Sequence, residues 1–261
     1  MKKLLNLPVT IFMLGSFFLA SCGNTNADGA MKAPVQSSAD TASQDAQKES
    51  GEAEGKENEK DEKSSIAKPA VYVAGTDANA KTTENLQVAF KGETTASAKY
   101  AAYSKKAEQE GQHEIALLFK AASIAENIHA KNHQAVLQES GVAVPLITPE
   151  FTVMSTKENL QEALAGETYE ATIMYPGFLT AANAAGNQLA LISLNYAYKT
   201  EKKHKVFYEA ALTALQNNTT KKLAAVYYVC PTCGNTYETT APSRCGISMT
   251  GGDKFLKIIS L

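Results

Sequence analysis

An internal repeat is the feature that most constrains how this chain can fold. The stretch Glu84–Tyr100 (ENLQVAFKGETTASAKY) recurs as Glu158–Tyr175 (ENLQEALAGETYEATIMY), and each copy is followed by a second long stretch, at 115–138 and 188–215. All four stretches place apolar residues at helical spacing. The link over 141–155 contains two prolines and is too long for a tight hairpin. Two helical hairpins joined by one long crossover predict an all-α four-helix bundle.

Acidic residues and histidines recur in register inside this repeat. Glu126 and His129 form a Glu-x-x-His pattern in the first half, and Glu201 and His204 repeat it in the second. Residues three apart on a helix share a face, so each pair points one way. Gly-Glu dipeptides on the other two helices add further carboxylates. Because carboxylates offset the repulsion between two divalent cations and imidazoles complete their coordination, the pattern predicts a di-metal site.

Other aromatic and histidine residues lie near the predicted ligands. Tyr100 and Tyr175 follow the Gly-Glu dipeptides by two helical turns. They either hydrogen-bond metal-ligating carboxylates or serve as plain core aromatics. We expect His113 and His133 to be surface or polar-network residues.

The C-terminal stretch contains the start of a second metal site. Cys230-x-x-Cys233 supplies one pair of thiolates, and Cys245 begins another, but Ser248 stands where the fourth cysteine belongs. Three interpretations follow. The site holds iron with Ser248 or water as the fourth ligand, it holds zinc, or it is empty with Cys230 and Cys233 joined by a disulfide. Asp253 is a more distant oxygen donor.

The N-terminus has the pattern of an export signal. Two lysines precede an apolar run that ends in Leu19-Ala20-Ser21-Cys22, which resembles the lipobox of bacterial lipoproteins. The resemblance implies cleavage before Cys22 and lipid on its sulfur. The polar segment that follows cannot bury enough apolar surface to fold, so we expect a disordered linker. The predicted location is therefore the cell envelope, at the periplasmic face or the outer membrane, with the membrane reached only through the lipid anchor.

Composition and these patterns divide the chain and exclude one class of partner. The formal charge is −2, arginine occurs once, and no basic stripe is interleaved with aromatics, so we expect no nucleic-acid binding. The predicted parts are a signal peptide at 1–21, the lipidated cysteine and linker at 22–80, the four-helix domain at 81–218 and the C-terminal metal domain at 224–261.

Together these motifs resemble the rubrerythrin family over about Thr82 to Phe255, here in a bacterial lipoprotein form. The resemblance implies a ferritin-like di-iron bundle with one long crossover and a small C-terminal β rubredoxin-like knuckle. It also implies that Glu126 and Glu201 bridge the metals, and that Glu170 and His129 exchange as ligands with redox state. The implied di-iron ligands are Glu93, Glu126, His129, Glu167, Glu170, Glu201 and His204.

The resemblance further implies an enzyme, an NADH-linked peroxidase that reduces hydrogen peroxide to water. Its cofactors would be two irons in the bundle and one iron or zinc at the C-terminal site, through which electrons enter. Its partners would be hydrogen peroxide, an electron-donor protein or reductase, and a second copy of the chain. In such a homodimer or larger assembly, one subunit's rubredoxin-like domain approaches the other's di-iron site. The alternative is a ferroxidase or iron-sequestering protein without peroxidase turnover.

Overall fold

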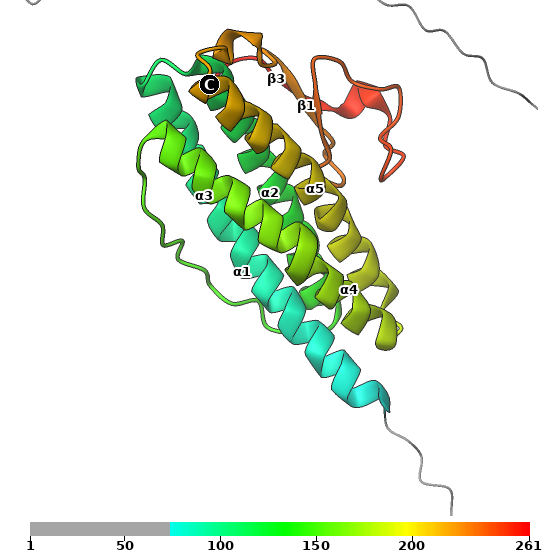
Figure 1. The fold of residues 1–261 in the computed structure, drawn as a ribbon. Helices are drawn as coiled ribbons and strands as arrows, with labels where there is room; N and C mark the ends of the chain where they lie inside the picture. Colours follow the sequence, from blue (N-terminus) through cyan, green and yellow to red (C-terminus); the bar gives the residue numbers. More distant parts are fainter. Residues whose placement is uncertain (1–73) are drawn as a thin grey trace, which may run out of the picture. The chain divides into compact units, whose positions relative to one another are not determined.

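The computed structural model describes residues 74–261, and they form a helical bundle followed by a small sheet (Figure 1). The first hairpin pairs α1 with α2, and the second pairs a segmented helix with α5. This arrangement confirms the predicted fold class. The bundle elements are α1 (Ala74–Gln109), α2 (His113–Glu139), α3 (Thr156–Tyr169), the π-helix η1 (Glu170–Met174), α4 (Tyr175–Ala184) and α5 (Gln188–Gln216).

Local sequence sets most of the helix ends. Ser155 caps α3: its side chain accepts from the Glu158 backbone N–H, and the Glu158 side chain accepts from the Ser155 backbone N–H. The glycines after α1, α2 and α4 have positive φ, which lets the last turn close without strain. Helix α1 begins at Ala74, so it extends into the range predicted as linker. Alanines, which favour helix, continue the helix upstream of the first apolar repeat position.

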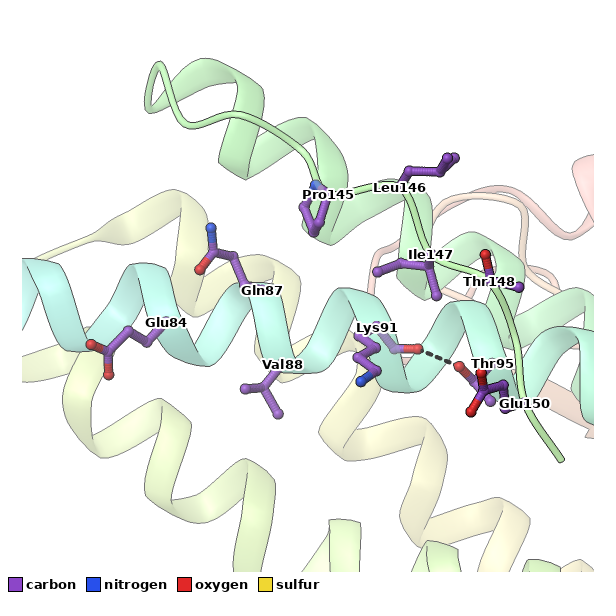
Figure 2. A pocket seen from close by; sticks show the side chains of 10 residues that line it. All are labelled: Glu84, Gln87, Val88, Lys91, Thr95, Pro145, Leu146, Ile147, Thr148 and Glu150. Carbon is purple, nitrogen blue, oxygen red and sulfur yellow. Dashed lines mark hydrogen bonds between the residues drawn. The ribbon is translucent and has the colours of Figure 1, made fainter.

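The crossover between α2 and α3 runs beside α1 (Figure 1). Figure 2 shows the residues that line a groove here, among them Lys91 and Thr95 of α1 and Ile147 and Glu150 of the crossover. The crossover is held at its C-terminal end, where the Tyr103 hydroxyl donates to the Thr152 carbonyl at 3.1 Å. A connection of this length lets the second hairpin pack against the first, while the two helices within each hairpin stay antiparallel.

The apolar core of the bundle is split into two clusters. One is rich in aromatic rings and includes Tyr103, Phe119 and Tyr208. The other is mostly aliphatic and includes Leu86 and Leu194. The buried acidic residues and histidines of the repeat lie along the same helices between these clusters. The site is therefore enclosed by apolar side chains on both sides, which lowers the local dielectric and strengthens its electrostatics.

The C-terminal region is a three-stranded antiparallel sheet of order β2-β1-β3. The strands are β1 (Tyr227–Val229), β2 (Thr236–Glu238) and β3 (Leu256–Ile258), with 3-10 turns η2 (Thr220–Lys222) and η3 (Gly252–Lys254). The Tyr227 ring packs on Phe207 of α5, and Lys120 of α2 donates to the Ser260 carbonyl at 2.9 Å. The sheet thus rests on α2 and α5, the two helices that supply the Glu-x-x-His pairs.

Several predictions fall on residues outside this range. The signal peptide, the lipidated Cys22 and most of the linker lie outside the described residues. Within residues 74–261, no helix combines the length and apolar character needed to cross a bilayer.

Candidate metal centre

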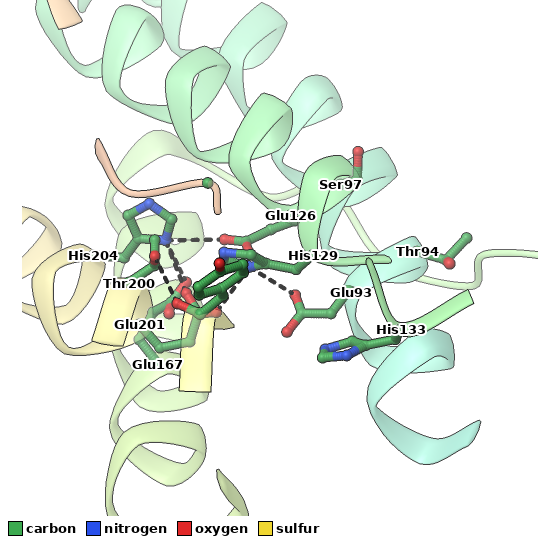
Figure 3. A network of polar contacts seen from close by, with 12 residues as sticks. Glu93, Thr94, Ser97, Glu126, His129, His133, Glu167, Thr200, Glu201 and His204 are labelled. Atoms are coloured by element: carbon green, nitrogen blue, oxygen red, sulfur yellow. Dashed lines mark hydrogen bonds and ion pairs between the residues drawn. The ribbon is translucent and has the colours of Figure 1, made fainter. Parts of the chain in front are cut away.

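Four helices bring six of the seven predicted ligands into one buried cluster (Figure 3). Helices α1 and α3 each supply one glutamate, and α2 and α5 each supply a Glu-x-x-His pair. All six residues are at most 1% exposed. They are Glu93, Glu126, His129, Glu167, Glu201 and His204.

Two of the carboxylates lie between the two histidines. Glu126 places one oxygen 2.8 Å from Nδ1 of His129 and the other 3.0 Å from Nδ1 of His204. Glu201 does the same, at 3.0 Å and 3.1 Å. The cluster therefore divides into two four-residue groups that share Glu126 and Glu201, with Glu93 completing one and Glu167 the other. Shared carboxylates between two ligand groups are the arrangement that holds a pair of metal ions.

The donor atoms of this cluster are unusually short of hydrogen-bond partners. One oxygen of Glu126, one of Glu167, both of Glu201 and Nδ1 of His204 are buried without a hydrogen bond. Several of these atoms are within ion-pair distance of one another but lack hydrogen-bond geometry. Buried polar atoms without partners are costly, and cations would satisfy them. The residues present thus fit a di-metal group.

The charges of the cluster also require cations or protons. Burial, followed by the charges of Glu201 and Glu126, raises the pKa of Glu93 to about 8. Burial and the same neighbours raise the pKa of Glu167 well above its usual value. Burial alone would lower the pKa of His204, but Glu126 and Glu201 raise it to about 9. Without metal, the site therefore retains protons that bound cations would replace.

Of the two alternatives for Tyr100 and Tyr175, the structure shows hydrogen bonds to the clustered carboxylates, and these bonds cross between the repeats. The Tyr100 hydroxyl, from α1, donates to Glu167 at 2.8 Å. Tyr175, which follows Glu167 in sequence, donates instead to Glu93 on α1. Each tyrosine therefore orients the terminal carboxylate of the opposite hairpin.

Glu170 is the one predicted ligand that lies outside the two groups. It is half-buried at the first position of the π-helix η1. Burial and the charge of Glu93 raise its pKa well above normal, so it still lies close to the cluster. Of the two residues that were predicted to exchange, the structure places His129 among the clustered donors and Glu170 beside them.

His133 lies in a buried polar network, which is one of the two placements expected from the sequence. Its ring is fully buried, with Nδ1 2.8 Å from the Ser193 hydroxyl and Nε2 3.3 Å from the Tyr175 hydroxyl. Burial and the nearby His129 lower its pKa to about 3, so it is neutral at ordinary pH. Sequence reasoning missed Ser193, because a single serine on a helix has no distinguishing pattern. His113, in contrast, is a partly exposed residue paired with Glu108.

The C-terminal sheet region touches the cluster directly. The outer nitrogen of His129, Nε2, is 3.1 Å from the Cys233 carbonyl, and that of His204 is 3.0 Å from the Thr236 hydroxyl. Asn132 adds a bond to the Thr232 carbonyl at 3.0 Å. The approach of the cysteine region to the bundle centre, which was predicted between two subunits, is thus made within one chain. Thr236 was not predicted, since only tertiary packing brings β2 to α5.

The three cysteines form a second group of donors. Cys230, Cys233 and Cys245 are buried free thiols whose sulfurs lie close enough to share one metal ion. The Sγ atoms of Cys233 and Cys245 are 3.4 Å apart. Thiolates gathered in this way suit zinc or an iron-sulfur site. Asp253 is exposed in η3 and is not part of the group.

Comparison with known proteins agrees with both sites. The family model for rubrerythrin matches residues 84–212. Rubrerythrin-2 of Clostridium acetobutylicum is 34% identical over 181 residues, which cover 68% of this chain and 96% of that protein. The chain belongs to the rubrerythrin family. This family binds a di-iron centre and a rubredoxin-like iron, and the described residues provide a donor group for each.

A second relative extends the comparison to a solved structure. Nigerythrin of Nitratidesulfovibrio vulgaris is 34% identical over 176 residues, covering 67% of this chain and 85% of nigerythrin. A structure of fully reduced, all-ferrous nigerythrin superposes with a TM-score of 0.61 at 32% identity, over 67% of this chain and 86% of that one. The ferritin-like bundle and the small C-terminal knuckle of this rubrerythrin-family chain are therefore both as predicted.

Proposed function

We propose that this protein is a rubrerythrin-type peroxidase that reduces hydrogen peroxide to two waters, using two electrons and two protons. The observation that most supports it is the pair of buried donor groups that share Glu126 and Glu201. When bound, two iron ions there would supply the two electrons. The ligands would be the six clustered residues, with Glu170 adjacent for exchange against His129.

The chain's own residues prepare the site for this reaction. Apolar side chains on either side exclude water, so the charges act in a low dielectric. Tyr100 and Tyr175 fix the orientation of Glu167 and Glu93. When Glu93 is ionised, the Tyr175 hydroxyl donates a hydrogen bond to the Glu93 carboxylate. The Tyr175 oxygen then accepts from Nε2 of His133. Nδ1 of His133 in turn accepts from the Ser193 hydroxyl. This ordered chain of hydrogen bonds ends at a ligand carboxylate and is placed to move a proton to it.

Electrons would enter through the C-terminal site. Cys233 belongs to that site, and its carbonyl is hydrogen-bonded to His129 of the bundle. One hydrogen bond therefore links the two donor groups within a chain. We assign the supply of electrons to a donor protein or an NADH-linked reductase. A homodimer or larger assembly remains part of the proposal, although this link does not require one.

The test uses the purified chain loaded anaerobically with Fe(II). Substoichiometric peroxide should oxidise it faster than an equal amount of O₂, with loss of one peroxide per two bundle irons. Glu126→Gln should abolish the fast phase, while Glu139→Gln, an exposed site on the same helix, should keep it. A reaction faster with O₂ than with peroxide would reject the proposal and favour iron oxidation or sequestration.

The location of the protein is a separate proposal that rests on the lipobox-like sequence before Cys22. The chain would be exported and held at the cell envelope by lipid on that cysteine. Wild-type cells fed labelled palmitate should yield a labelled protein in the membrane fraction. Cys22→Ala should lose the label. Equal labelling of the variant would count against the anchor.

A further inference from the structure

Ser248 occupies the place where a fourth thiolate would complete the C-terminal site. The spacing Cys245-x-x-Ser248 repeats the spacing Cys230-x-x-Cys233. The Ser248 hydroxyl is 3.3 Å from the Cys230 sulfur, and that sulfur lies within 4.8 Å of the sulfurs of Cys233 and Cys245. The hydroxyl oxygen thus lies beside the three thiols, where it could act as a fourth donor to an ion that they share.

Two threonines hold that oxygen in place. The Thr250 hydroxyl lies 2.8 Å from the Ser248 hydroxyl and donates to Thr232 at 2.8 Å. Thr232 lies between Cys230 and Cys233, so the three hydroxyls join the two cysteine loops. Ligand atoms that are fixed by such partners need little reorganisation on binding metal. The Thr250 oxygen can also accept a hydrogen bond from the Ser248 hydroxyl, which leaves a lone pair of the Ser248 oxygen available to a cation.

The other sources of a fourth ligand are placed elsewhere. Among the described residues, no further cysteine, histidine or acidic side chain joins the three thiols, and Asp253 is exposed. A disulfide between Cys230 and Cys233 is also absent from residues 74–261, where all three thiols are free.

We propose that the Ser248 hydroxyl oxygen is the fourth protein ligand of the C-terminal metal ion, which gives a site of three sulfurs and one oxygen. The inference concerns ligation alone, so it does not depend on peroxide reduction. An oxygen donor is harder than a thiolate and favours the ferric ion. The site should therefore have a lower reduction potential than one with four thiolates.

The experiment compares the full chain with three variants: Ser248→Cys, Ser248→Ala and the control Ser243→Ala, an exposed hydroxyl on the same loop. Each is loaded with iron, and the thiolate-to-iron absorption band is recorded. This band reports only the C-terminal site, because the bundle donors contain no sulfur. The reduction midpoint and the rate of iron loss to a chelator are measured on the same samples, with zinc loss as a parallel test.

If Ser248 is a ligand, Ser248→Cys shifts the band and raises the midpoint, whereas Ser248→Ala loses iron and zinc about tenfold faster or more. Ser243→Ala behaves as the wild type. The inference is overturned if Ser248→Ala matches the wild type in band, midpoint and metal retention. It is also overturned if the wild type binds neither metal and titrates with fewer than three free thiols. Neither result bears on the peroxide reaction of the bundle, which is measured separately.

Discussion

Gly234 lies where the cysteine loop contacts His129 of the bundle, and this contact explains why the residue is a glycine. Its φ is +74°, a conformation that side chains rarely adopt. A Cβ there would overlap the imidazole of His129, with Cδ2 only 2.8 Å away. Glycine is therefore needed for two reasons, the turn and the close approach of the cysteine loop to His129.

Gly234→Ala should separate the cysteine loop from His129 and lower the free energy of unfolding by about 2 kcal/mol. Electron transfer from the C-terminal site to the bundle should slow as the Cys233–His129 hydrogen bond is lost. Stopped-flow reduction and denaturant unfolding measure the two effects. Gly246→Ala is the matched control, because its Cβ would meet no atom closer than 3.7 Å. Equal behaviour of the two variants would contradict the prediction.

His133→Phe should leave the Tyr175 and Ser193 hydroxyls buried without their shared partner. Unpaired buried polar groups cost about 1–3 kcal/mol, so unfolding should become easier by about that amount. If the hydrogen-bonded chain moves protons, peroxide oxidation of the ferrous protein should also slow and change its pH profile. His133→Gln should recover part of both. His113→Phe, at a partly exposed site, should change neither. An unchanged rate and pH profile in His133→Phe would limit the residue to a structural role.

At the scale of elements, the π-helix explains a difference between the two repeats. Tyr100 follows Glu93 by seven residues, but Tyr175 follows Glu167 by eight. The extra residue is absorbed in η1 (Glu170–Met174), so both tyrosines still reach the cluster. π-bulges of this kind are common at functional sites. Here the bulge begins at Glu170, the carboxylate that the first repeat lacks.

The start of α3 should depend on its capping box. Ser155→Ala removes the hydroxyl that accepts from the Glu158 N–H and should cost ~1 kcal/mol. That corresponds to a Tm lower by about 2–4 °C for a domain of this size. Ser155→Asp should keep the wild-type Tm. Thr213→Ala, an exposed site inside α5, serves as the control. A Tm that is insensitive to Ser155→Ala would show that the crossover alone fixes this end.

At the scale of the whole molecule, stability without metal should fall as pH rises. Glu93 keeps its proton in the folded state up to a pKa of about 8, compared with 4.5 when unfolded. A raised acid pKa stabilises the fold at low pH, and this contribution is lost between those two values. The pKa of His204 is raised from 6.5 to about 9, so the stability that this histidine contributes is also lost as pH rises.

The chelator-treated protein should therefore have a lower Tm at pH 8.5 than at pH 5.5, and bound metal should raise the Tm more at pH 8.5. Thermal unfolding followed by circular dichroism, with and without zinc, measures both values. Glu93→Gln should flatten the slope of the metal-free protein. If the Tm of the metal-free protein rises from pH 5.5 to pH 8.5, the raised pKa values of Glu93 and His204 are contradicted.

The sequence by itself determined the bundle, the capping of α3 and the set of candidate ligands. Helical periodicity and three-residue spacing are local properties, so the repeat predicts which residues share a face. Tertiary structure alone decided that Glu126 and Glu201 lie between both histidines, that His133 is buried, and that the Ser248 hydroxyl contacts the Cys230 thiol. These relations join segments far apart in sequence, and spacing along one helix does not specify distances between elements. The contact of Cys233 with His129 within one chain was decided in the same way, by how β1 and β2 pack on α2 and α5.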